Sequence, residues 1–273
     1  MIETVRNASS YSVRQICETL GFNRSLLYYQ PKSDPSEGEL REKIEALSLR
    51  YPKYGYRRIT ALLLRQGYLV GYRRVARLMK EENLSVSIKR VCRTTSSLEG
   101  PRNWVNSIEN LEVCRRDQVW VGDITYVRLN RCFVYVAVLM DVFTRVIKGW
   151  QVSRHLHTSL TLKPLQEALC HSVCEIHHSD QGAQYLSSAY TSTLTRHGVE
   201  ISVAHRGRPW ENGYAERLIR TLKEEEVDIN DYQDITEARE RIGHFIRHVY
   251  HQKRPHSALG YLTPLEFQRK NLS

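Results

Sequence analysis

The stretch QVWVGDITYVRLNRCFVYVAVLMDVFTRVIKGWQVS, residues 118–153, decides the fold of the larger part of the chain. Residues 118–129 and 132–144 are rich in Val, Ile, Tyr and Phe, and Asn130-Arg131 separates them as the turn of a β-hairpin would. Residues 145–153 have the same character. The sequence therefore predicts three consecutive strands, of which the first two form a hairpin.

The chain after this stretch alternates between helical and strand-like segments. Helices are expected at 159–173, 187–198, 214–227 and 234–250, and short strands at 174–180 and 199–204. A glycine-containing loop, HRGRPWENG, occupies residues 205–213. Three consecutive strands followed by alternating helices and strands predict an α/β domain with a mixed sheet flanked by helices.

The first 90 residues have helical patterns. Residues 12–30, SVRQICETLGFNRSLLYYQ, predict two short helices around Gly21. This arrangement resembles a helix-turn-helix, although any helical hairpin would give a similar pattern. Residues 31–39 are expected to form a linker because of their Pro, Ser and Gly content. A helix at 39–50 then begins a second small helical unit.

The second helical unit is strongly basic. Nine basic residues and no acidic residue lie between Arg50 and Lys80. Two of its helices begin with the same sequence, Tyr-Arg-Arg, and we expect DNA contacts from Arg57, Arg58, Arg73 and Arg74. The alternative is a helical hairpin that only packs against the rest of the chain.

The overall charge also favours a polyanionic partner. The 273 residues include 40 Lys and Arg against 30 Asp and Glu, and residues 1–110 hold 19 of the basic and 11 of the acidic side chains. Such an excess favours binding to the phosphates of nucleic acid. The sequence has no signal-peptide pattern and no apolar run of about 18 residues. We therefore expect a cytoplasmic protein without a membrane partner. The six cysteines lack Cys-X-X-Cys spacing, and we expect them to be reduced thiols.

Asp123 lies in the middle of the first predicted strand. An acidic residue there opposes β propensity and is costly if it is buried without a partner. Asp141 interrupts the second strand in the same way, but Gly122 beside Asp123 permits the close approach of another backbone or a ligand. A bound metal ion is the simplest compensation for Asp123.

Two further carboxylates follow at a suggestive spacing. Asp180, in HHSDQGAQY, ends a predicted strand, and Glu216, in ENGYAERL, lies in the first turns of a predicted helix, with 35 residues between them. Together with Asp123 they would converge at the carboxyl edge of the sheet. Three carboxylates around two Mg²⁺ ions roughly 4 Å apart are typical of two-metal phosphoryl transfer.

These residues lie in motifs that resemble a known family. The motifs are WVGDITY, HHSDQGAQY, WENGYAERLIRTLK, KRPHSALGYLTPLEF and, before them, GYRRITALLLRQG. They resemble the bacterial insertion-sequence transposases with a retroviral-integrase-like (DDE) catalytic core, of the second-frame (OrfB) type. The resemblance covers nearly the whole chain.

The resemblance implies a ribonuclease-H-like fold with Asp123, Asp180 and Glu216 as catalytic residues and ligands of two Mg²⁺ ions, for which Mn²⁺ would substitute. It implies cleavage of a DNA strand at the element end and transfer of the 3′-hydroxyl to another phosphodiester. The expected partners are DNA, in the form of element ends and target, further copies of the chain on that DNA, and a first-frame protein supplied as a fusion. The expected location is the bacterial nucleoid.

Four more side chains are candidates for DNA contacts. Lys223 lies two turns after Glu216 on nearly the same helix face, although a surface lysine would look the same. Asn212 precedes Glu216 by four residues and would contact DNA or cap the helix. Gln184 follows Asp180 closely. Arg254, in KRPHSALG, would contact a phosphate or stabilise the C-terminal tail.

These observations predict five segments and leave two rival functions open. The segments are a helix-turn-helix-like unit at 1–32, a basic helical unit at 38–90, a linker at 91–114, the catalytic core at 115–227, and a C-terminal helix and tail packing on the core at 228–273. One rival is a nuclease on the same fold that does not join strands. The other is a DNA-binding regulator in which the acidic residues are structural.

Overall fold

The computed structural model describes Gly21, Asn23 and residues 12–19, 36–86, 104–130 and 132–271. The chain divides into two compact units, Met1–Lys43 and Ile44–Ser273. In the first unit, helix α2 (Val13–Thr19) precedes Gly21, whose φ of 65° is left-handed, as a turn after the helix requires. The second helix predicted within 23–30 lies, beyond Asn23, outside the described residues.

Helix α3 (Ser36–Arg50) begins earlier than the sequence predicts. Residues 36–39 are helical, so the linker prediction is wrong for them. Glu37 and Glu39 lie in the first turn, where carboxylates interact favourably with the helix dipole. Arg41 also donates to Glu37 at 3.0 Å, one turn apart. These local interactions outweigh the helix-breaking tendency of Gly38.

Helices α4 (Tyr56–Arg65) and α5 (Tyr72–Glu81) confirm the two basic helices predicted at the Tyr-Arg-Arg sequences. Both are amphipathic, and their apolar faces are fully buried at Ile59, Leu63, Val75 and Leu78. Burial of side chains of this size stabilises the unit by about 1.5–3 kcal/mol each. The rings of Tyr56 and Tyr72 are 6.5 Å apart, so the two helices begin side by side.

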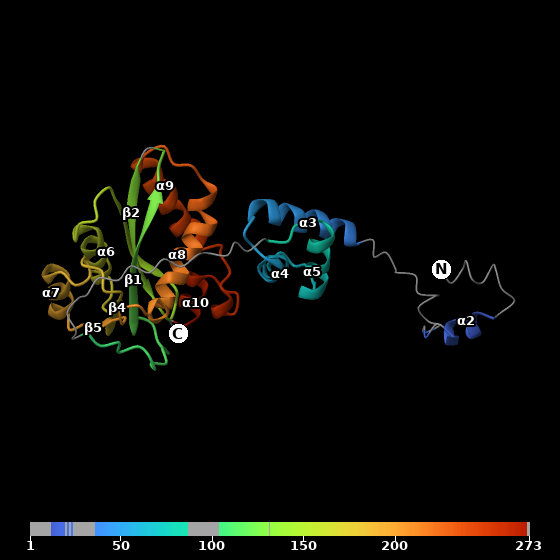
Figure 1. Cartoon of the computed structure of the whole chain (residues 1–273), viewed down its shortest axis with the longest axis horizontal. Helices are drawn as coiled ribbons and strands as arrows, with labels where there is room; N and C mark the ends of the chain where they lie inside the picture. Colours follow the sequence, from blue (N-terminus) through green and yellow to red (C-terminus); the bar gives the residue numbers. More distant parts are fainter. Residues whose placement is uncertain are drawn as a thin grey trace. The chain divides into compact units, whose positions relative to one another are not determined.

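A five-stranded sheet forms the centre of the larger unit (Figure 1). Its strands are β1 (Val119–Arg128), β2 (Phe133–Asp141), β3 (Ile147–Ser153), β4 (Ile176–Ser179) and β5 (Glu200–Val203). Their order across the sheet is β3-β2-β1-β4-β5. The first three strands are antiparallel, and β4 and β5 continue the sheet in parallel with β1. The predicted hairpin and mixed sheet are confirmed.

Helices cover both faces of this sheet (Figure 1). One face carries α6 (Ser159–Leu169) and α7 (Ser188–Arg196), and the other carries α8 (Gly213–Glu225) and α9 (Ile235–His244). β1 supplies both cores, with Trp120 on the first face and Val119 and Val121 on the second, as alternation in a strand requires. Helix α6 approaches β3 so closely at Gly149 that a Cβ there would lie 2.4 Å from the carbonyl oxygen of Pro164.

Short elements complete the fold. They are the 3₁₀ turns η2 (Pro209–Asn212), η3 (Val227–Ile229) and η5 (Ser257–Leu259), the π-helical turn η4 (Phe245–Tyr250) and helix α10 (Pro264–Lys270). The single helix predicted at 234–250 is therefore α9 continued by η4. Helix α10 begins with a capping box in which Thr263 and Glu266 bond each other's backbone amides.

The segment before β1 differs from the predicted linker at 91–114. Its described part, from residue 104, packs Ile108, Leu111 and Val113 against the core on the α8 face. The amide of Ser107 also donates to Ser202 Oγ at 2.9 Å. Three apolar residues within a polar segment are enough to hold it on the domain. Among the helices described, none combines the length and the apolar character needed to cross a membrane.

Candidate active site

The register of two parallel strands brings the first two candidate carboxylates together. Gly122 of β1 stands opposite Ser179 of β4. Asp123 and Asp180 are the next residue on each chain segment, so both lie at the carboxyl end of the parallel β1–β4 pairing, although β1 itself continues to Arg128 beside β2. In parallel sheets this carboxyl edge is where ligands bind.

Glu216 comes to the same region from α8. The helix buries Leu218 in the core that also contains Val121 of β1, which leaves Glu216 on its exposed side. The start of α8 is held to β1 by Asn212, whose side-chain amide donates to the carbonyl oxygen of Gly122 at 3.3 Å. Asn212 is 4% exposed and makes no helix-capping bond. Its position thus matches neither the expected cap nor an exposed DNA contact.

The charges of Asp180 and Glu216 act on Asp123. Burial, the charge of Asp180 and the charge of Glu216 raise the pKa of Asp123 to about 7. The amide of Ile124, which donates to Asp123 at 2.7 Å, and the ammonium group of Lys223 lower the same pKa without cancelling the rise. The site therefore concentrates negative charge that the protein compensates only in part.

Two glycines allow close packing around the aspartates. A Cβ on Gly122 would lie 3.0 Å from the ring of Tyr185, and one on Gly182 would lie 2.9 Å from Asp180 Oδ1. The Gly182 amide donates to that oxygen at 3.0 Å, while burial raises the pKa of Asp180. Tyr185 is 3% exposed, and its hydroxyl has no hydrogen-bond partner among the described residues. Gly122 thus makes room for a core side chain, where the sequence suggested a backbone or a ligand.

The residue types fit divalent cations, although their side chains are not gathered into a finished metal site. In the described part of the chain, no three Asp, Glu, His or Cys side chains lie close enough together to hold an ion. Carboxylate oxygens are nevertheless the ligands that Mg²⁺ prefers. A cation near Asp123 would offset the repulsion that raises its pKa.

Lys223 and an aromatic pair border the carboxylates. The Lys223 ammonium lies 4.3 Å from the centre of the Tyr126 ring. Tyr126 is 59% exposed, and its ring meets Phe133 edge-on at 5.9 Å. Sequence reasoning missed Tyr126, because a tyrosine in a strand is normally part of the core; its place three residues after Asp123 was the one available signal.

The arginines expected to contact DNA divide into exposed and engaged side chains. Arg57 and Arg73 are exposed at the starts of α4 and α5, and each lies over the ring of the preceding tyrosine, at 5.4 and 6.0 Å from its centre. Arg74 is half-buried. Gln184, also expected at the DNA, donates to the carbonyl oxygen of Leu156 at 2.9 Å.

Arg254 and Arg58 share one buried carboxylate. Arg254 is 3% exposed and donates to Glu225 at 2.8 to 3.0 Å, and Arg58 donates to the same group at 3.1 Å. This geometry favours the stabilising alternative for Arg254 and gives Arg58 a structural contact as well. Glu225 was missed because it lies in the run KEEE at 223–226, which is typical of a solvated helix surface.

Two other polar residues near the site are structural. Asp141 is fully buried and accepts bonds from the amides of Asp117 at 3.0 Å and Thr144 at 2.9 Å, so it closes the turn after β2. His178 is also fully buried, its ring bonds Ser202 at 2.8 Å, and burial lowers its pKa to about 4. Asp141 has partners for both of its oxygens, whereas Nε2 of His178 is buried without a hydrogen-bond partner among the described residues.

Family models match the integrase-like core and the helical unit before it. Models of the integrase core domain match residues 114–209 and 197–264, and a model of an HTH-like domain matches residues 35–91. The transposase of insertion sequence element IS904 from Lactococcus lactis is 33% identical over 90% of this chain and 100% of its own length. The transposase InsF of IS3A from Escherichia coli is 32% identical over 58% of this chain and 56% of its own. Among solved structures, the catalytic core domain of BIV integrase is 18% identical, covering 57% of this chain and 99% of that one with a TM-score of 0.43.

The domain content and the site define a protein with an integrase-type core preceded by an HTH-like domain. The similarity to the IS904 transposase extends over the full length of that protein. The chain belongs to the family of insertion-sequence transposases with an integrase-like catalytic core.

Proposed function

We propose that this transposase cleaves a DNA strand at the element end and transfers the 3′-hydroxyl to another phosphodiester, with Asp123, Asp180 and Glu216 as the catalytic carboxylates. The observation that carries the proposal is the convergence of three carboxylates: Asp123 in β1 and Asp180 just after β4 follow paired residues, and the charges of Asp180 and of Glu216 from α8 both raise the pKa of Asp123. A structural carboxylate normally gains a basic or hydrogen-bonding partner on burial, as Asp141 does. A half-buried aspartate whose pKa is raised by the charges of two further carboxylates indicates a functional site.

Two divalent ions, Mg²⁺ or Mn²⁺, are the cofactors that this set of oxygen ligands would hold. Bound there, they would stabilise charge on the attacking and leaving oxygens of phosphoryl transfer. Asp123 and Asp180 provide ligands fixed by the sheet, and Glu216 provides one from α8. Asn212 supports this arrangement because it ties the start of α8 to β1 beside Asp123.

Basic groups around the carboxylates would position the DNA. Lys223 would neutralise a phosphate next to the reacting one, since its charge is already felt at Asp123. Exposed Arg57 and Arg73, at the paired starts of α4 and α5, would bind backbone phosphates of the element end. Because transposition joins two ends to a target, we propose that several copies of the chain assemble on the DNA.

A strand-joining assay tests the proposal. Purified protein is mixed with a labelled duplex carrying the element end, Mg²⁺ or Mn²⁺ is added, and strands are resolved on a denaturing gel. We expect cleaved and joined strands, which Glu216→Gln abolishes and Glu224→Gln, an exposed glutamate on the same helix, leaves unchanged. Cleavage without joining would indicate the nuclease. DNA binding without any reaction, even when an upstream first-frame protein is supplied as a fusion, would indicate the regulator.

A further inference from the structure

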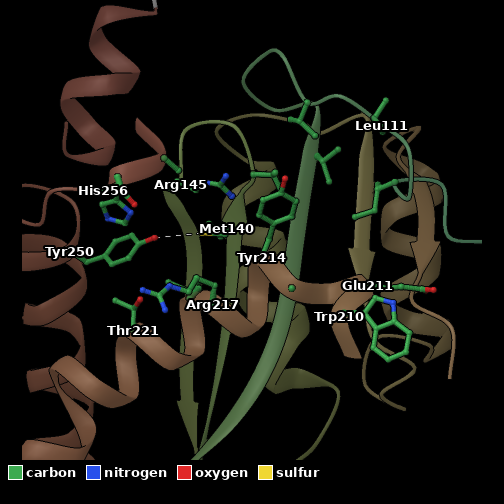
Figure 2. A pocket seen from close by; sticks show the side chains of 18 of the residues that line it. Leu111, Met140, Arg145, Trp210, Glu211, Tyr214, Arg217, Thr221, Tyr250 and His256 are labelled. Atoms are coloured by element: carbon green, nitrogen blue, oxygen red, sulfur yellow. Dashed lines mark hydrogen bonds between the residues drawn. The ribbon is translucent and has the colours of Figure 1, made fainter. Parts of the chain in front are cut away.

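A cleft of about 620 Å³ lies beside α8 (Figure 2). It is bounded by the end of β2, by α8, by the C-terminal segment after α9 and by the residues before β1. In the described part of the chain, none of the three catalytic carboxylates lines it. Glu216 and Arg217 are adjacent on α8, about 100° apart around the helix, and Arg217 is the one that faces the cleft.

Positive charge gathers in this cleft. Four arginines line it: Arg58, Arg145, Arg217 and Arg254. Glu225 pairs with two of them, Arg58 and Arg254. Arg145 and Arg217 form no ion pair with any described residue. Burial and the charges of Arg254, Arg58 and Arg145 lower the pKa of His256 to about 2, so this histidine is neutral and adds no charge to the cleft.

The acidic residues of the lining do little to cancel this charge. Glu211 has a side chain that is 3% exposed, and it is held by His205 at 2.9 Å and Arg208 at 3.3 Å. Glu109 is exposed at the rim. The cleft therefore offers two guanidinium groups, those of half-buried Arg145 and exposed Arg217, to an anion.

Two aromatic rings line the same cleft as these guanidinium groups. Trp210 is 63% exposed and Tyr214 is 42% exposed, so both present ring surface to solvent. Arg145 lies 4.5 Å from the centre of the Tyr214 ring. Figure 2 shows Arg145, Tyr214 and Arg217 near the middle of the view, with Tyr250 on one side and Trp210 on the other. Exposed rings next to cationic groups are the combination that binds unpaired nucleotides, by stacking and phosphate contacts together.

We propose that this cleft binds a short unpaired segment of a DNA strand, with a phosphate between Arg145 and Arg217 and a base stacked on Trp210. The inference rests on the proposed strand-transfer function, because the strand would pass from the carboxylates to the cleft around the start of α8, where Gly213 and Tyr214 line it. A base-paired strand could not place a base face on Trp210, so the cleft selects unpaired DNA. It would hold the part of the strand next to the cleaved phosphodiester.

Photo-crosslinking to the full chain tests this site. A single-stranded oligothymidine containing 5-iodouracil is irradiated with the protein, and the crosslinked peptides are identified by mass spectrometry. We expect crosslinks at Trp210 or Tyr214, reduced about tenfold or more in the double variant Arg145→Ala/Arg217→Ala, as expected for the loss of about 1.4 kcal/mol of binding. The matched control is Lys163→Ala/Arg196→Ala, which removes two exposed cations from α6 and α7 on the opposite face of the sheet and leaves the crosslinks unchanged.

The outcomes separate this site from the catalytic proposal. Crosslinks confined to other regions, or a yield at Trp210 that the Arg145→Ala/Arg217→Ala variant does not change, would overturn the site even if strand joining is observed. Binding of an acidic peptide in place of the oligothymidine would also overturn it and indicate a protein partner. A third outcome is that crosslinks at Trp210 persist in Asp123→Asn while the wild type joins no strands. This result would retain the site and refute the catalytic proposal.

Discussion

Replacing Glu225 by Gln is expected to destabilise the larger unit severely. The Glu225 side chain is 6% exposed and neutralises Arg254, at 3% exposure, and Arg58, at 20%. The glutamine keeps the size of the side chain but leaves two close, buried guanidinium groups without a counter-charge. Removing one partner of a buried ion pair typically costs about 3–5 kcal/mol. We therefore expect a loss of about 3 kcal/mol in the free energy of unfolding.

Urea denaturation followed by far-UV circular dichroism measures this loss. With a slope of about 2–3 kcal/mol per molar urea, the midpoint of Glu225→Gln should fall by about 1 M or more. Glu224→Gln is the matched control, because it makes the same change one residue earlier on an exposed position and should stay within about 0.5 kcal/mol of the wild type. Adding Arg58→Met to Glu225→Gln removes the second unpaired charge and should restore part of the stability. Equal midpoints for the two single variants would refute the reasoning.

Three further predictions concern the sheet and the site. Gly122→Ala places a Cβ 3.0 Å from the buried ring of Tyr185. We expect the free energy of unfolding in urea to fall by about 1–3 kcal/mol and strand joining to decrease. Unchanged activity and stability would show that the ring moves freely. Burial lowers the pKa of His177 to about 3, whereas the unfolded chain takes up a proton near pH 6.5, so stability falls as pH drops. Between pH 7 and pH 5 the wild type should lose about 2 kcal/mol more than His177→Gln, and parallel pH profiles would contradict this. Lys223→Ala should reduce strand joining at least tenfold, and Lys223→Arg should retain most of it; equal loss in both would argue against a charge contact with phosphate.

The first three strands of the sheet could be predicted from the sequence because their residue composition is strongly typical of β-strands. Residues 118–153 combine β-branched and aromatic residues with one clear turn, and local pattern and tertiary structure agree there. Asp123 stood out for the opposite reason, since its charge conflicts with the strand around it. The register that places Gly122 opposite Ser179 could not be read from either segment alone, because it depends on pairing between distant parts of the chain.

Side-chain partners were the least predictable feature. Glu225 and Glu224 are neighbours in one acidic run, yet the first is buried against two arginines and the second is exposed. Asn212 sits at the start of a helix, where capping is the usual local role, but its amide bonds Gly122 across 90 residues. In both cases a long-range contact overrides the local preference. The same holds for two neighbouring arginines: Arg57 is exposed, whereas Arg58 forms a long-range ion pair with Glu225.

The most direct test of the account is the binding of Mn²⁺ to the full chain in complex with the element end, measured by electron paramagnetic resonance. The wild type and the control Glu224→Gln should bind two ions per chain. Asp123→Asn and Glu216→Gln should each weaken binding at least tenfold, because the carboxylates form one site. Unchanged Mn²⁺ binding in Asp123→Asn would contradict the claim that these carboxylates are its ligands.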